Sequence, residues 1–254
     1  MSEKISILGC GWLGSVLATD LHKKGFKVKG STTTQIKTND LRASGIDPFV
    51  IDICSIQSNL ESFLDSEVLV IAITSKNIDS FRTLIEKIEA SPIKKVVFVS
   101  STSVYPNTNA VITEDSDTKD TSLAEIEKLF IDNSAFKCTI VRFGGLYGYD
   151  RKPGNFIKGK KSISNPEGYI NFIHRDDCIE ILKRIIEKNV WNEVLNACSD
   201  DHPKRREFYL REAKKVGQSS ISFDENSRND FKIIDSQKLK RLLDYQFRYS
   251  DLFN

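Results

Sequence analysis

The feature that most constrains this chain is a glycine-rich loop directly after a short apolar segment. Residues 5–8 are followed by Gly9-Cys10-Gly11-Trp12-Leu13-Gly14 and then by helical spacing of apolar residues over 16–24. In a strand–loop–helix unit, the three glycines allow a tight turn, close approach of the backbone to a pyrophosphate, and close packing of the helix on the strand. The helix N-terminus would favour the anion. The sequence therefore predicts a dinucleotide site at Gly9 to Gly14, against the alternative of a glycine-rich turn that binds nothing.

Strands and helices are expected to alternate along the first 150 residues. Short apolar segments predict strands at 5–8, 26–29, 49–53, 68–73, 96–99 and 139–143, and apolar periodicity predicts a further helix at 78–90. Segment 68–73 is apolar throughout, as expected for a strand buried on both faces of a parallel sheet. Alternation over short connections predicts an α/β fold, a Rossmann-type doubly wound parallel sheet.

The alternation weakens from about residue 148. Residues 151–169 are polar and rich in Lys, Gly, Ser and Asn, which predicts a long loop. Asp177 is expected to begin a helix as its N-cap, with Glu180 completing a capping box. A strand is expected at 194–196 and a helix at 203–216. We therefore expect a Rossmann domain at 1–147 and a small C-terminal substrate lobe at 148–254, part of which returns to the Rossmann core.

Composition narrows the possible partners and compartments. The chain has 254 residues, with 37 Lys+Arg against 35 Asp+Glu and a formal charge of +2, which gives no electrostatic reason for a nucleic-acid partner. No segment approaches the roughly 18 apolar residues of a membrane span, and the N-terminus lacks the order of a signal peptide. The five cysteines are scattered, which predicts neither a disulfide framework nor a metal site and is typical of the cytoplasm.

The residues after the second expected strand bear on the choice of cofactor. A site for NAD usually places Asp or Glu there to bind the ribose 2′-OH. This chain instead has Ser31, Thr32 and Thr33, with Lys37 nearby and no acid. Hydroxyls and a lysine can accept a 2′-phosphate, so we favour NADP over NAD. The alternative is that these threonines form a simple polar turn.

Three further segments have recognisable patterns. They are Ser-Ser-x-x-Val-Tyr within residues 98–105, Arg-x-x-x-x-Tyr-Gly at residues 142–148, and Asn-x-Ile-His-x-Asp-Asp at residues 171–177. These segments resemble those of the extended short-chain dehydrogenases, the NAD-dependent epimerase/dehydratase family. Together with the glycine loop, these segments follow the family's order over about the first 200 residues. The resemblance implies the family's fold, its NAD(P) cofactor and its cleft.

The resemblance also implies roles for single residues. Asp52 and Ile53 match the pair that meets the adenine ring. Ala72 and Thr74 match the strand end that lines the nicotinamide ribose. Ser101 matches the family's catalytic Ser or Thr, which polarises the substrate oxygen.

Three residues are candidates for contact with substrate. Tyr147 belongs to the Arg-x-x-x-x-Tyr-Gly segment. Lys160 lies in a basic stretch, at the position of the loop that covers substrate in the family, and could hold phosphates; the alternative is a solvated basic loop. His174 is either an acid or base of the cleft or a helix-entry histidine bonded to nearby backbone.

The chain departs from the family at its central catalyst, Tyr-x-x-x-Lys, in which the lysine lowers the pKa of the tyrosine. Aligning Glu-Ile-Glu-Lys-Leu at 125–129 with the family's Glu-Ala-Glu-Lys-Leu places Lys119 at the tyrosine and Leu123 at the lysine, and no tyrosine lies between Tyr105 and Tyr147. This loss resembles the atypical branch of the family, as does the segment 199–209. Tyr105 could replace the missing phenol or only line the cleft.

Two functions follow. The first is an NADP-dependent oxidoreductase, epimerase or dehydratase acting on a small sugar-like or nucleotide-linked molecule, in which Ser101 polarises the reacting oxygen and Tyr105 or a cofactor group replaces the base. The second is an NADP-binding sensor or partner-binding module without redox chemistry. The oligomeric state is expected to be either a monomer or a homodimer. The family often dimerises through the helix at this position, but Glu125 and Glu127 make it more polar here than a large apolar contact needs.

Overall fold

The computed structural model describes residues 3–55, 59–218 and 220–253, and the chain divides into two compact units. The first unit comprises residues 1–100, 120–141 and 179–194, and the second comprises residues 101–119, 142–178 and 195–254. The division does not fall at residue 147. Residues 101–119 already belong to the second unit because they follow the end of a strand, and residues 179–194 return to the first.

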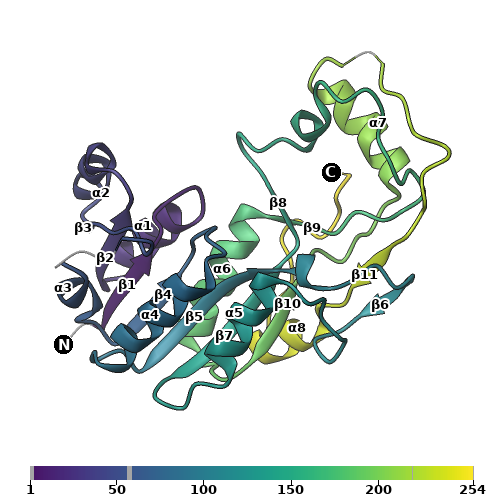
Figure 1. Cartoon of the computed structure of the whole chain (residues 1–254). Coiled ribbons are helices and arrows are strands. Elements are labelled where there is room, and N and C mark those ends of the chain that lie inside the picture. Colours follow the sequence, from purple (N-terminus) through teal and green to yellow (C-terminus); the bar gives the residue numbers. More distant parts are fainter. Residues whose placement is uncertain (1–2, 56–58, 219, 254) are drawn as a thin grey trace. The chain divides into compact units, whose positions relative to one another are not determined.

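A seven-stranded sheet has the order β10-β7-β5-β4-β1-β2-β3 (Figure 1). Its strands are β1 (Lys4–Leu8), β2 (Lys27–Thr32), β3 (Asp47–Val50), β4 (Val68–Ile71), β5 (Lys95–Ser101), β7 (Lys137–Phe143) and β10 (Val194–Ala197). β1 pairs in parallel with both β2 and β4, so that Ile7 lies opposite Gly30 on one side and Val70 on the other. The chain reverses its direction of winding between β1 and β4. The predicted doubly wound parallel sheet is therefore confirmed.

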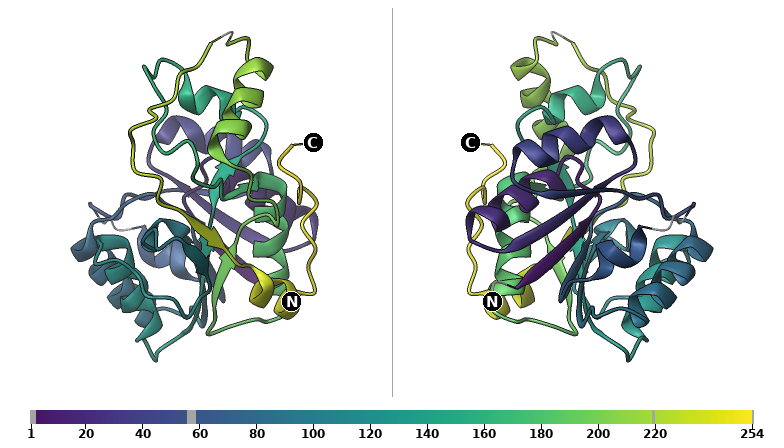
Figure 2. Two further views of the ribbon diagram at one scale, coloured as in Figure 1. Left: turned by 90° about the vertical axis from the view of Figure 1, so that its right-hand side faces the viewer. Right: turned by 90° about the vertical axis from the view of Figure 1, so that its left-hand side faces the viewer.

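Helices cover both faces of the sheet in the first unit. They are α1 (Gly14–Lys23), α2 (Thr38–Ala43), α3 (Leu60–Leu64), α4 (Ile78–Glu89), α5 (Ser122–Ile131) and most of α6 (Arg175–Glu187). Figure 2 shows α4 and α5 on one side of the strands and α6 on the other. Two ion pairs, Lys24–Glu187 and Lys183–Asp20, join α1 to α6. Within the described ranges, no helix is both long and apolar enough to cross a membrane.

The larger core of the first unit lies between the sheet and helices α3, α4 and α5. Alternate strand residues such as Phe98 of β5 point into it, where Phe98 stacks on Phe130 of α5 with ring centroids 5.0 Å apart. The ring of Phe81 of α4 meets the ring of Phe98 edge-on, with ring centroids 5.7 Å apart. Val68 and Val70 of β4, which point the other way, are also fully buried, so the strand is covered on both faces as its composition predicts.

One acidic residue of α5 faces inward, contrary to expectation. Glu127 is 2% exposed and accepts a hydrogen bond from the Ser100 hydroxyl, whereas Glu125 is exposed and pairs with Arg82. Burial of a carboxylate requires such a partner. Glu127 therefore ties α5 to β5 and adds nothing to the polarity of the outer face.

The second unit contains two short parallel strand pairs and a separate apolar cluster. β8 (Gly145–Tyr147) pairs with β9 (Phe172–His174), and β6 (Ala110–Ile112) pairs with β11 (Lys232–Ile234). The remaining elements are the 3-10 helices η2 (Thr102–Val104) and η3 (Pro153–Ile157) and the helices α7 (Arg205–Lys215) and α8 (Gln237–Leu243). Phe208 and Tyr209 of α7 pack with Ile157 of η3 and Ile170. The loop expected at 151–169 thus contains a short helix.

Helix α6 begins two residues before the expected start. The ring nitrogen Nδ1 of His174 accepts a hydrogen bond from the N–H of Asp176 at 3.2 Å, so the histidine caps this helix. Asp177 lies inside the first turn and is fully buried. Its carboxylate accepts bonds from the Tyr245 hydroxyl and from the N–H of Arg248, and so anchors the C-terminal segment. The expectation that Asp177 is the N-cap is wrong.

We predict that Phe130→Ala lowers the free energy of unfolding by about 3–5 kcal/mol, because it leaves a cavity beside two other aromatic rings. Urea unfolding followed by circular dichroism measures the change. Ile131→Ala, which removes a side chain that is 50% exposed in the same helix, is the control and should change stability far less. Equal losses for the two variants would contradict the packing described here.

Candidate functional site

The three glycines of the loop occupy two kinds of position: Gly9 and Gly14 have no room for a side chain, and Gly11 faces open space. Gly9 has φ +98°, and a Cβ there would lie 2.7 Å from the carbonyl oxygen of Ala72. A Cβ on Gly14 would lie 2.2 Å from the carbonyl oxygen of Gly9, so helix α1 can approach β1 only through a glycine. At Gly11, by contrast, a Cβ would meet nothing within 4 Å. The loop is therefore tight at Gly9 and Gly14 and open at Gly11, as a cradle for a diphosphate requires.

Ser31 holds this loop in place. Its hydroxyl accepts a hydrogen bond from the N–H of Gly9 at 3.0 Å, and its carbonyl accepts one from the N–H of Cys10 at 2.7 Å. Ser31 is 1% exposed and Thr32 is also buried, so neither hydroxyl is placed to receive a 2′-phosphate as expected. Thr33 is exposed at the next position, and so is Lys37 at the end of η1 (Gln35–Lys37). Of the residues expected to contact the cofactor beyond β2, Thr33 and Lys37 are therefore the exposed ones.

The other side chains of the loop pack against the protein. The Sγ of Cys10 lies 2.7 Å from where a Cβ on Gly30 would be. Burial raises the pKa of the Cys10 thiol to about 12, so it is a neutral packing group. Leu13 is buried, while Trp12 is partly exposed. Contacts with a dinucleotide at Cys10 and Leu13 would thus come from the main chain.

The residues expected around the adenine and nicotinamide ribose occupy strand ends of the first unit. The N–H of Ala72 donates to the carbonyl of Leu8 at 2.8 Å, beside the glycine loop, and Thr74 is exposed two residues later. Asp52 is exposed, and its Oδ1 accepts from the N–H of Cys54. The side chain of Ile53 is buried in the core, so it does not face a ligand.

The second unit contains a polar cavity of about 320 Å³. We call it the polar cavity; its lining residues are Ser101, Thr102, Ser103, Asn107, Gly145, Asn165, Tyr169, Asn171, Arg205, Asp230, Phe231 and Lys232. Ser101 is the last residue of β5, and its Oγ accepts a hydrogen bond from the N–H of Ser103 at 3.1 Å. Tyr169 meets Phe231 edge-on, with ring centroids 4.9 Å apart. The cavity thus combines hydroxyls, amides, a phenol and two basic side chains.

Tyr105 does not reach this cavity. It is 0% exposed, its hydroxyl donates to Oδ1 of Asn196 at 2.9 Å, and it accepts from Arg142 at 2.5 Å. The guanidinium of Arg142 also lies 4.8 Å from the centre of the ring. Burial raises the pKa of the Tyr105 phenol. The catalytic role expected for Tyr105 does not fit this placement, because a group with no exposed surface cannot exchange a proton with a substrate.

Lys232 is fixed at the edge of the polar cavity. Its ammonium donates to the main-chain carbonyls of Thr102 at 2.8 Å and Tyr105 at 2.7 Å. Asn171 holds the strand that carries it, donating to the carbonyl of Lys232 and accepting from the N–H of Ile234, both at 2.9 Å. Burial, with a smaller contribution from repulsion by Lys119, lowers the pKa of the Lys232 ammonium to about 8.

The three expected substrate contacts lie outside the lining of the polar cavity. His174 is 7% exposed, stacks on Tyr249 at 3.7 Å and meets Tyr147 edge-on at 5.1 Å. Burial lowers the pKa of the His174 imidazole. Lys160 is exposed. The structure supports the alternative interpretation of His174, a helix-entry histidine bonded to backbone, and leaves Lys160 in a solvated loop.

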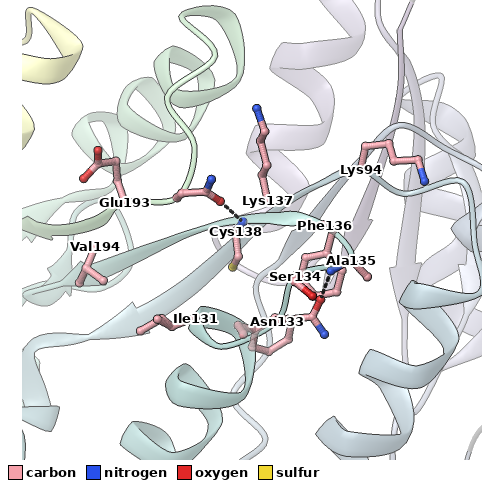
Figure 3. Close-up of a pocket in the computed structure, with 12 residues that line it drawn as sticks. Lys94, Ile131, Asn133, Ser134, Ala135, Phe136, Lys137, Cys138, Glu193 and Val194 are labelled. Atoms are coloured by element: carbon pink, nitrogen blue, oxygen red, sulfur yellow. Dashed lines mark hydrogen bonds between the residues drawn. The ribbon is translucent and has the colours of Figure 1, made fainter.

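A larger cavity, of about 590 Å³, opens at the amino-terminal starts of β7 and β10 (Figure 3). It is lined by Lys94, Ile131, Phe136 and Cys138 among others, and Asn192 accepts from the N–H of Cys138 at 3.2 Å. Ligands of open α/β sheets bind beyond the carboxyl ends of the strands. This cavity is at the opposite end and is therefore not the cofactor site.

Sequence reasoning did not identify Lys232, Tyr169 or Arg205 as residues of a cavity. Lys232 comes from a short strand that no pattern predicted. Tyr169 precedes the segment 171–177 by two residues and Arg205 lies within the segment 199–209, but neither resemblance implied a role for them. Asn171 was part of a motif, but its task of holding β11 depends on a residue 61 positions away. No cluster of three or more His, Cys, Asp and Glu that could hold a metal occurs in the parts of the chain that the structure describes.

Two comparisons with known sequences bear on the chain as a whole. A family model described as NAD(P)H-binding matches residues 9–188. Protein YeeZ of Escherichia coli (strain K12) is 28% identical over 267 residues, which cover 98% of this chain and 97% of YeeZ.

Two solved structures show that the fold is shared. A functionally unknown conserved protein from Silicibacter pomeroyi has a TM-score of 0.83 at 19% identity, covering 99% of this chain and 96% of that chain. UDP-glucuronic acid 4-epimerase from Bacillus cereus, in complex with UDP-glucuronic acid and NAD, has a TM-score of 0.79 at 19% identity, covering 98% of this chain and 95% of that chain.

We predict that Gly11→Ala leaves the fold intact but weakens NAD(P) binding by at least about tenfold, because the added methyl enters the space that a diphosphate needs. Gly14→Ala should instead lower the melting temperature, because its Cβ meets the carbonyl of Gly9. Fluorescence of Trp12 and thermal unfolding measure the two effects. If Gly11→Ala had a normal melting temperature and an unchanged affinity for NAD(P), the nucleotide would not bind at this loop.

His174 should make stability depend on pH. Because its pKa is lowered in the fold, the unfolded chain binds a proton first as pH falls below about 6.5, and stability is lost in that direction. His174→Asn, which can still cap α6, should flatten the change in urea midpoint between about pH 5 and pH 7. The same pH dependence in both proteins would mean that His174 is not protonated on unfolding in this range.

Proposed function

The chain belongs to the NAD(P)H-binding family, and from this premise we propose that it is an NADP-dependent oxidoreductase, epimerase or dehydratase acting on a sugar-like or nucleotide-linked molecule. The observation that carries the proposal is the open space at Gly11, which lies between Gly9 and Gly14, two positions that no residue with a side chain fits. A diphosphate placed there would meet main-chain N–H groups at the start of α1. When bound, the nicotinamide supplies or accepts a hydride.

The polar cavity supports an enzyme. A hydroxyl at the end of a parallel strand, Ser101, lies in a cavity with amide and basic side chains, the lining that a sugar's hydroxyl groups require. Tyr169 is a half-buried phenol of the same lining and is our candidate for the acid or base of the reaction. The Bacillus cereus structure with UDP-glucuronic acid and NAD supports a nucleotide-linked substrate by its shared fold.

A second candidate function is an NADP-binding sensor without redox chemistry. Two observations favour it. Leu123, which aligns with the family's catalytic lysine, packs against the core, and Tyr105 is fully buried. A sensor would keep the nucleotide loop and need no acid or base in the polar cavity.

Turnover of a panel of sugar nucleotides with NADP and NAD tests the first function. We predict that Ser101→Ala lowers kcat by about 10²–10⁴-fold, the usual range for a positioned proton-transfer or polarising group, with little change in NADP affinity. Ser101→Thr, which keeps the hydroxyl and its bond to the N–H of Ser103, should restore much of the rate. NADP binding with no conversion of any substrate would leave the sensor as the function.

The choice of cofactor has its own test. Thr33 is exposed directly after β2, so Thr33→Asp should repel a 2′-phosphate and shift preference from NADPH toward NADH by about tenfold or more. Titrations of each nucleotide, followed by Trp12 fluorescence, measure the ratio. Thr83→Asp, on the exposed face of α4, adds the same charge and should not change it. Stronger binding of NADH by the unmodified protein would overturn the preference for NADP.

A further inference from the structure

The charge of Lys232 is left uncompensated by the protein. Its two hydrogen-bond acceptors are the main-chain carbonyls of Thr102 and Tyr105, and no carboxylate lies within ion-pair distance of it among the described residues. The like charge of Lys119 repels it and adds to the lowering of its pKa. A half-buried ammonium without an anion is costly unless it is paired. An anion in the polar cavity, which Lys232 lines, would supply such a partner.

The carbonyl contacts aim the ammonium and do not use all of it. An ammonium has three N–H donors and no acceptor, and two of them are directed to Thr102 and Tyr105. One donor therefore remains. Asn171 holds the main chain at Lys232 and at Ile234, so the third donor is presented from a strand that is fixed by side-chain hydrogen bonds. Such a fixed, partly desolvated donor binds a charged acceptor more strongly than a neutral one.

A second positive charge lines the polar cavity, and the one carboxylate of the lining is already paired. Arg205 of α7 also lines the polar cavity, its guanidinium lies 5.3 Å from the ring centre of Tyr209, and its Nε has no hydrogen-bond partner among the described residues. Asp230 is the single acidic residue of the lining, and its carboxylate is paired with Arg228 at 2.7 Å. The cavity therefore offers two cations from separate elements and no free carboxylate.

We propose that Lys232 binds a carboxylate or phosphate oxygen of the ligand of the polar cavity, with Arg205 as a second cation, so that this site takes an acidic substrate. The inference deepens the proposed function, on which it rests for the identification of this cavity as the substrate site. A neutral sugar would leave the third N–H of Lys232 with a weak acceptor and both charges unpaired. An acidic one satisfies both.

The test uses ligands that differ only in charge. Binding of D-glucuronate, D-glucose and inorganic phosphate to the full chain, without any nicotinamide cofactor, is measured by ligand-observed NMR and calorimetry. We expect glucuronate or phosphate to bind and glucose not to bind. Comparison of the two anions shows whether a carboxylate or a phosphate is preferred. Because no cofactor is present, failure here is distinct from failure of NADP binding or turnover.

Variants assign the binding to Lys232. Lys232→Met should weaken binding of the anion by about 10–100-fold, the loss expected for a hydrogen bond to a charged group, and Lys232→Arg should retain much of it. Lys214→Met removes an exposed charge of α7 that is not part of the cavity and should leave binding unchanged. Phosphate that binds at the start of α1 would still bind to Lys232→Met. The measure of the proposed site is therefore the part of the phosphate binding that the variant loses.

Two results would overturn the proposal. One is binding of glucuronate and phosphate no tighter than that of glucose. The other is a Lys232→Met variant that binds the anion as tightly as the wild-type protein and differs from it only in a lower melting temperature. That result would mean that the lysine only links its strand to η2. If Lys232→Met does not fold, Arg205→Met carries the test, because it leaves the carbonyl contacts of Lys232 in place and should still weaken the anion.

Discussion

The contact on which the first unit depends is the approach of Gly14 to the carbonyl of Gly9. With 2.2 Å between that oxygen and an added Cβ, no other residue lets α1 begin this close to β1. The same approach points the start of the helix at the open position of Gly11. Ser31 then fixes the turn through the N–H groups of Gly9 and Cys10, which joins the loop to the neighbouring strand β2. One short distance thus sets both how closely α1 packs on β1 and where its N-terminus begins.

The sequence predicts most of the first unit because its signals are local. Apolar segments such as 68–71 and the periodicity of 78–89 lie where strand and helix form, and errors at their ends are a few residues. The polar residues were harder. Ser31, Tyr105 and His174 carry reactive groups in the sequence, but each is satisfied by a partner inside the fold, and in Tyr105 that partner, Asn196, is 91 positions away. Residue type shows what a side chain can do and not whether a ligand can reach it.

The polar cavity shows the complementary difficulty. Its lining comes from the end of β5, from residues 165–171, from the start of α7 and from β11. Only tertiary structure brings these segments together, so a motif search finds Ser101 and Asn171 and passes over Lys232. The two-sided hydrogen bonding of Asn171 to β11 gives a physical reason for an asparagine in that segment, independent of any resemblance.

Helix α5 fastens the sheet. Leu123 packs against the core, and the carboxylate of Glu127 accepts a hydrogen bond from the Ser100 hydroxyl of β5. The N–H of Lys119, just before this helix, donates to the carbonyl of Val104. The main-chain carbonyls of Thr102 and Tyr105, which lie close to Val104 in the chain, accept hydrogen bonds from the ammonium of Lys232. The segment after β5 is therefore held by hydrogen bonds from the side chain of a lysine of β11, and the same side chain brings positive charge to the polar cavity.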